Sequence, residues 1–106
     1  MKKPIFLFTV LAASVVFLFA AEAPKHSVKP RAGYVPDAKT AIKIAVAVWE
    51  PIYGEEQIAK QKPYQATLTN GVWNVTGSLP SLSVGGVAVA EIAKDDGRIL
   101  KVSHGR

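Results

Sequence analysis

The sequence predicts an α+β fold, in which an N-terminal helix and a short second helix pack on a four-stranded antiparallel sheet. Three observations lead to this prediction. Apolar residues recur at steps of three and four after residue 37, which is helical spacing. Alternating or β-branched stretches follow between residues 64 and 104, and glycine-containing tight turns connect them in pairs. A helical half followed by a run of strands is typical of the α+β class.

The first 20 of the 106 residues differ from the rest of the chain. Lys2 and Lys3 precede the uncharged stretch PIFLFTVLAASVVFLFA, which ends in small residues. A basic start, an apolar core and a small-residue end are typical of an export signal peptide. We expect cleavage after Ala20, with an uncleaved membrane anchor as the alternative. Either one places the domain in the periplasm or otherwise outside the cytoplasm, and the chain contacts the membrane only through this segment.

Residues 21–36, AEAPKHSVKPRAGYVP, are predicted to form a proline-rich linker, because proline removes backbone donors and resists regular pairing. We expect Tyr34 and Val35 to touch the domain already, as a hydrophobic staple does before a helix. The domain itself is expected to span residues 37–106.

The first helix is predicted to begin at Asp37, whose carboxylate can accept hydrogen bonds from the free amides of the first turn. Pro51 cannot donate a hydrogen bond and clashes with the carbonyl of Ala47, so we expect the helix to be kinked at Pro51 or to stop near Glu50. The expected apolar face comprises Ala38, Ala41, Ile42, Ala45, Val48 and Trp49. Trp49, Tyr53, Tyr64 and Trp73 are expected to cluster where the helix corner meets the sheet.

Gly54 permits a turn, after which acidic residues open a short second helix that Pro63 ends. The predicted strands are residues 64–69, 72–79, 86–93 and 98–104, with a loop over residues 80–86. Asn70-Gly71 is a strong hairpin signal, and we expect Leu100 and Val102 to share one face of the last strand. Glu91 is buried if Val87 and Val89 face the core, and solvated if Ala88, Ala90 and Ile92 do; the rarity of buried glutamate favours the second arrangement.

Composition excludes several classes of function. The chain has no cysteine, which rules out cysteine catalysis and cysteine metal sites. Thirteen basic and eight acidic residues give a net charge of +5, which falls to +3 when Lys2 and Lys3 leave with the signal. These charges are scattered, so we expect no nucleic-acid partner. His26 and His104 are the only histidines, and no ligand cluster suggests a metal or a cofactor.

Several segments together resemble a bacterial immunity-protein family with a nuclear transport factor 2-like (cystatin-like) fold. These segments are AIKIAVAVWEPIYGEEQIAKQKPY, NGVWNVTGSLP, GGVAVAEIAKDDGRIL and the terminal HGR. The positions that match the family pattern are Pro51, Ile52, Tyr53, Gly54, Pro63, Trp73, Gly77, Leu79, Pro80, Gly85, Gly86, Gly97, His104 and Gly105.

The resemblance implies a protein that binds and neutralises a bacterial toxin, without catalytic residues of its own. The regions expected to contact the cognate toxin are the corner at residues 51–56, the loop at residues 81–86 and the C-terminal residues 103–106. The candidate partner-binding residues are Tyr53, Glu55, Glu56, Ser83, Gly85, Gly86, His104 and Arg106. The alternative is a small-ligand-binding protein or an enzyme that uses the concave sheet face, and a homodimer formed through a strand edge stays open.

Overall fold

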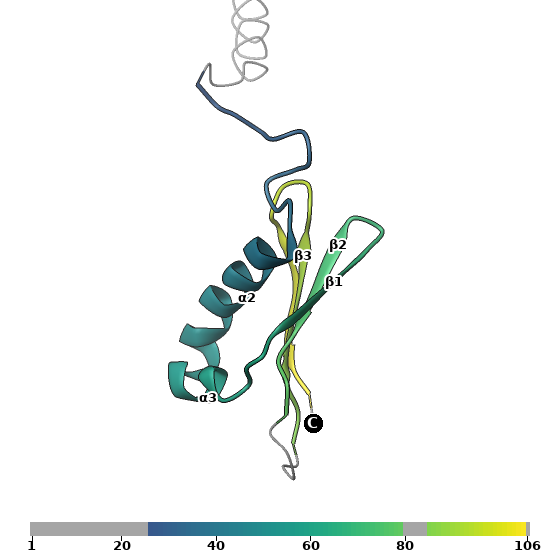
Figure 1. Ribbon diagram of the computed structural model, residues 1–106. Coiled ribbons are helices and arrows are strands. Elements are labelled where there is room, and N and C mark those ends of the chain that lie inside the picture. The colour runs from purple at the N-terminus through teal and green to yellow at the C-terminus, as the bar shows by residue number, and fades with distance from the viewer. Residues whose placement is uncertain (1–25, 80–84, 106) are drawn as a thin grey trace, which may run out of the picture.

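A helix of 16 residues lies across one face of an antiparallel sheet in the computed structural model, which describes residues 26–79 and 85–105 (Figure 1). The described elements are α2 (Ala38–Tyr53), α3 (Glu55–Ala59), β1 (Gln65–Thr69), β2 (Val72–Thr76), β3 (Ala88–Ala93) and β4 (Ile99–His104). The four strands lie in the order β1-β2-β3-β4, and each neighbouring pair is antiparallel. The predicted α+β class, with helices on a four-stranded antiparallel sheet, is confirmed.

Asp37 caps α2 as the sequence predicts. Its carboxylate accepts a hydrogen bond from the Thr40 amide at 2.8 Å. Hydrogen bonding to Thr40, first from its side chain and second from its amide, holds the pKa of the carboxyl below its usual range. The helix continues through Pro51 to Tyr53, so it does not stop near Glu50. Gly54 ends it with a positive φ of 97°, a conformation that favours glycine, and the Gly54 amide donates to the carbonyl of Glu50.

The core lies between α2 and the sheet. Small residues on both sides, Ala41 and Ala45 on the helix and Ala88 and Ala90 on β3, let the two layers approach closely. The larger side chains that fill the remaining space and are fully buried are Trp49, Ile58, Ile92, Val35 and Val75. Burying each of these apolar side chains stabilises the fold by roughly 1.5–3 kcal/mol.

The last two strands show where the expected pattern holds and where it fails. Ala88, Ala90 and Ile92 are fully buried, so the expectation that they face the core and leave Glu91 partly solvated is confirmed. The expectation that Leu100 and Val102 share a face is wrong. Between the pairs Glu91–Lys101 and Ile92–Ile99 the register shifts, which leaves Leu100 as the extra residue of a β-bulge, 44% exposed, while Val102 packs on the core.

The segment before α2 is bound to the sheet from Gly33 onward. The amides of Tyr34 and Val35 donate to the carbonyls of Asp95 and Lys94 at 2.9 and 3.0 Å. The Val35 carbonyl accepts a hydrogen bond from the indole of Trp73 at 2.8 Å, and the Val35 side chain is buried in the core. The expected contact of Val35 with the domain is confirmed, and Tyr34 remains 44% exposed.

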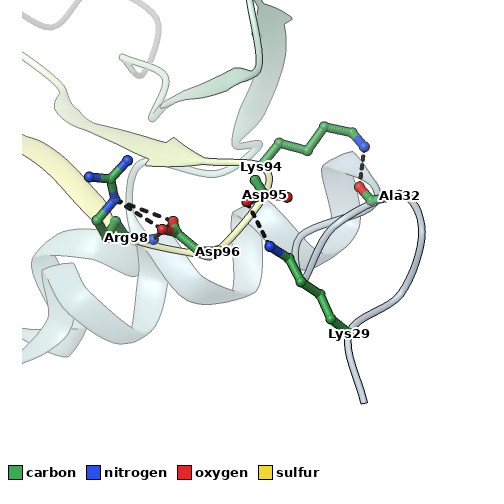
Figure 2. A network of polar contacts seen from close by, with 6 residues as sticks. All are labelled: Lys29, Ala32, Lys94, Asp95, Asp96 and Arg98. Carbon is green, nitrogen blue, oxygen red and sulfur yellow. Dashed lines mark hydrogen bonds and ion pairs between the residues drawn. The ribbon is translucent and has the colours of Figure 1, made fainter. Parts of the chain in front are cut away.

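Polar contacts reinforce this docked segment (Figure 2). Lys29 pairs with Asp95 at 2.7 Å, and this hydrogen bond raises the pKa of the lysine. The Lys94 ammonium donates to the carbonyl of Ala32. Asp96 accepts a hydrogen bond from the Arg98 amide at 3.0 Å, which lowers the pKa of its carboxyl. We call the β3–β4 turn together with residues 29–35 the arm end of the molecule.

Candidate functional site

The end of the molecule opposite the arm end brings together residues that are far apart in the sequence. α2 starts beside the arm end and runs to the corner at Gly54, where α3 begins (Figure 1). The rings of Tyr53, at the end of α2, and His104, at the end of β4, lie 5.1 Å apart between centroids and are tilted by 57°. Two residues of the predicted partner-binding set therefore form one aromatic pair.

The start of β3 lies beside the same pair. Ala88 is the register partner of His104, and the Gly105 amide donates to the carbonyl of Val87 at 3.2 Å. Gly85 and Gly86 directly precede this segment; Gly85 is exposed and has a φ of 126°. The C-terminal end of β4 therefore contacts both Tyr53 and the segment that leads into β3.

Glu55 and Glu56 complete the described part of the predicted set. Both are exposed in the first turn of α3, next in sequence to Tyr53 and Gly54. The other two predicted residues, Ser83 and Arg106, lie outside the described residues. From here on, "the α3 end" denotes the surface formed by Tyr53, Glu55, Glu56, Gly85, Gly86 and His104.

Gln61 is buried beneath the α3 end and hydrogen-bonds to residues of β3 and β4. It was not predicted from the sequence. It is only 3% exposed, and its side-chain oxygen accepts a hydrogen bond from the Ala88 amide at 2.8 Å. Its side-chain nitrogen lies 3.0 Å from Nε2 of His104. Gly77 packs so closely on Gln61 that a Cβ there would lie 2.3 Å from Oε1. A glycine at the end of a strand pattern signals close backbone approach, but not which residue approaches.

The remaining aromatic residues divide between the two ends of the molecule. Trp49 and Tyr64 lie 5.8 Å apart near the helix corner, and the Tyr64 hydroxyl donates to the Ile58 carbonyl at 2.8 Å. Burial, with a smaller contribution from Glu50, raises the pKa of this phenol. The expectation that Trp73 joins this aromatic cluster is wrong. Its indole donates to Val35, since the register of β2 places it near the β1–β2 turn.

No group of three or more histidine, cysteine, aspartate or glutamate side chains in residues 26–79 and 85–105 is arranged to hold a metal ion. A shallow pocket occurs at the arm end, lined by Arg31, Ala32, Gly71, Lys94 and Asp95. None of the helices in these ranges is both apolar enough and long enough to cross a bilayer.

Comparison with known proteins agrees with this fold. The family described as NTF2 fold immunity protein matches residues 40–106, which include α2 except for its first two residues and every later element. The chain belongs to this family. Membership supports an immunity role in general, in which such a protein binds a toxin, and it suggests a non-enzymatic role.

A protein of Escherichia coli strain K12, described as uncharacterized protein YhhH, is similar to this member of the immunity family. The two are 36% identical over 73 residues, which cover 68% of this chain and 58% of the E. coli protein. This chain therefore matches little more than half the length of that relative. No solved structure matches the chain significantly.

Proposed function

We propose that this chain is an exported immunity protein that binds a protein toxin through the α3 end and occludes the active surface of the toxin. The observation that carries the proposal is the pairing of Tyr53 and His104, which joins two predicted contact regions from opposite halves of the domain into one surface. A partly buried tyrosine at the centre of a polar surface is a typical anchor for a protein partner.

The surroundings of this pair support a protein partner. Glu55 and Glu56 place negative charge at one side of the surface, and Gly85 and Gly86 leave the backbone accessible at the other. Charged groups at the rim of an interface govern the rate of association and the choice of partner more than affinity. The surface thus offers an aromatic centre and a polar rim, the usual anatomy of a protein interface.

Binding can be tested with a candidate toxin encoded by a neighbouring gene. Replacement of Tyr53 by alanine is expected to weaken toxin binding at least about tenfold, because truncating an anchor residue costs about 2 kcal/mol or more. The measurement is isothermal titration calorimetry of the purified proteins, together with survival of cells that express the toxin and each variant.

Tyr34→Ala is the matched control, because Tyr34 is a partly exposed tyrosine at the arm end. Equal loss of affinity in both variants would show that the α3 end is not the binding surface. Failure of the wild-type chain to bind, together with a small molecule retained during purification, would favour the ligand-binding alternative.

Export is the second part of the proposal and rests on the apolar stretch between Pro4 and Ala20. A toxin met outside the cytoplasm is one that attacks the cell wall or membrane rather than nucleic acid. Mass spectrometry of the protein recovered from the periplasm should give a chain that starts at Ala21. Recovery of the full-length chain from the membrane fraction would instead indicate an uncleaved anchor, and recovery from the cytoplasm would contradict export.

A further inference from the structure

Gln61 connects three parts of the chain that meet at the α3 end. Its main-chain carbonyl accepts a hydrogen bond from the Ser78 amide at 2.8 Å, just after β2. Its side-chain oxygen accepts from the Ala88 amide at the start of β3, and its side-chain nitrogen faces His104 at the end of β4. One buried side chain therefore holds the start of β3 and the end of β4 in a fixed relation.

The direction of each hydrogen bond follows from the chemistry of the groups. The Ala88 amide can only donate, so the atom of Gln61 that faces it at 2.8 Å is the oxygen. The other side-chain atom of Gln61 is then the NH2 group, which donates only. His104 Nε2, 3.0 Å away, must accept this bond and therefore carries no proton.

The second ring nitrogen completes the assignment. In a neutral imidazole, one nitrogen carries the proton and the other accepts. The proton of His104 consequently lies on Nδ1, which is 3.2 Å from the carbonyl of Gly105, an acceptor. A doubly protonated ring would point an N–H at the Gln61 amide N–H, and two donors at this distance repel each other.

We propose that Gln61 is a positioning residue that fixes the tautomer of the neutral His104 ring, with the proton on Nδ1, and holds the ring against Tyr53. The side chains placed against the ring are Tyr53 from α2 and Gln61 from the α3–β1 connection, and Ala88 lies opposite on β3. That the held position of the His104 ring contributes to toxin recognition rests on the proposed function, whereas the assignment of the proton does not.

The test is nitrogen NMR of the two imidazole rings, with His26 in the arm as an internal reference. In the wild-type protein near neutral pH, His104 is expected to show a protonated Nδ1 and an unprotonated Nε2. Gln61→Glu keeps an oxygen for the Ala88 amide but replaces the donor that faces His104 by an acceptor. The variant is therefore expected to place a proton on Nε2 of His104.

Gln57→Glu is the matched control, since Gln57 is an exposed glutamine in α3 and the change in charge is the same. It should leave the spectrum of His104 unchanged. A wild-type ring protonated on Nε2, or a folded Gln61→Glu protein with the wild-type proton position, overturns the inference. If Gln61→Glu does not fold, the wild-type spectrum alone decides.

Toxin binding separates this inference from the proposed function. If the proton moves in Gln61→Glu and affinity for the toxin falls about tenfold or more while Gln57→Glu binds normally, both stand. If the proton moves and affinity is unchanged, the assignment of the proton stands and the proton position of His104 has no part in toxin binding. A wild-type chain that binds no toxin refutes the proposed function and leaves the NMR result in place.

Discussion

Gly77 is the residue whose replacement the structure constrains most directly at the α3 end. A Cβ at this position would lie 2.3 Å from Oε1 and 2.8 Å from Cβ of Gln61, so a buried side chain with two hydrogen-bonded neighbours would have to move. Gly77→Ala is expected to destabilise the domain by about 1–3 kcal/mol through overpacking. Urea denaturation measures this loss.

Gly105→Ala provides the comparison for Gly77→Ala. No heavy atom lies within 4 Å of a Cβ built at Gly105. The free energy of unfolding of Gly105→Ala should stay within about 0.5 kcal/mol of the wild type, as for most surface substitutions. Equal effects of the two alanines would show that the close approach of Gly77 and Gln61 does not matter for stability.

Asp37 gives a pH-dependent contribution to stability. Its pKa is lowered in the folded chain because the carboxylate accepts the Thr40 hydrogen bond, so the stabilisation is present above the ordinary value of 3.8 and is lost as the pH falls below it. Asp37→Ala is expected to lower the melting temperature at pH 7, and this difference from the wild type should vanish at strongly acidic pH.

Asp37→Asn separates the charge from the cap, because asparagine caps helices well without titrating. The melting temperature of Asp37→Asn should stay above that of Asp37→Ala in acid. Thermal unfolding followed by circular dichroism at several pH values makes the comparison, and a wild-type advantage over Asp37→Ala that stays constant down to pH 2 would contradict the assignment.

The single residues that local rules govern were predicted correctly from sequence. The Asp37 cap and the Asn70-Gly71 turn, where both residues have positive φ, depend on neighbours within a few positions. Gln61 could not be predicted, because its partners Ala88 and His104 lie 27 and 43 residues away. From the sequence alone, a single glutamine between two lysines is expected to be a surface residue.

At the scale of whole elements, the extent of α2 and the pairing in β4 depend on tertiary structure. Pro51 sits in the last turn of α2, where few hydrogen bonds remain to be broken, so Gly54 ends the helix instead. The bulge at Leu100 breaks the strict alternation on which the prediction for β4 rested. The positions of the two hairpins, by contrast, followed from turn residues and hydrophobic pattern alone.

The segment before α2 behaves as an element of the domain, although its composition is that of a linker. Val35 is buried in the core, whereas Val28, a few residues earlier, is 78% exposed. Val35→Ala is expected to destabilise the domain by about 1–3 kcal/mol, from lost apolar burial and the cavity left behind.

Val28→Ala is the corresponding control, and it should change the free energy of unfolding by no more than about 0.5 kcal/mol. Chemical denaturation of both variants measures the difference. Similar stabilities for the two proteins would mean that residues 33–35 are not docked in solution.

Across the whole molecule, the arm end and the α3 end lie at opposite ends of the sheet (Figure 1). A large group attached at the α3 end should block the toxin, while the same group at the arm end should not. The absence of cysteine allows this to be tested, because one introduced thiol is the sole site for a maleimide polymer.

Glu56→Cys carries the polymer at the α3 end, and Ser27→Cys carries it near the arm end; both positions are exposed. Toxin affinity should fall at least about tenfold for the first labelled protein and stay unchanged for the second. Inhibition by the label at position 27 alone would place the binding surface at the arm end.

The docking of Val35 against Lys94 and Trp73 also affects the order in which parts of the domain fold. Trp73 lies 38 residues after Val35 in the chain, so Val35 cannot dock before this later part of the chain has folded. Contacts between distant parts of a chain form slowly because a long loop must close first. Residues 33–35 are therefore expected to become ordered only once β2 and the β3–β4 turn are in place.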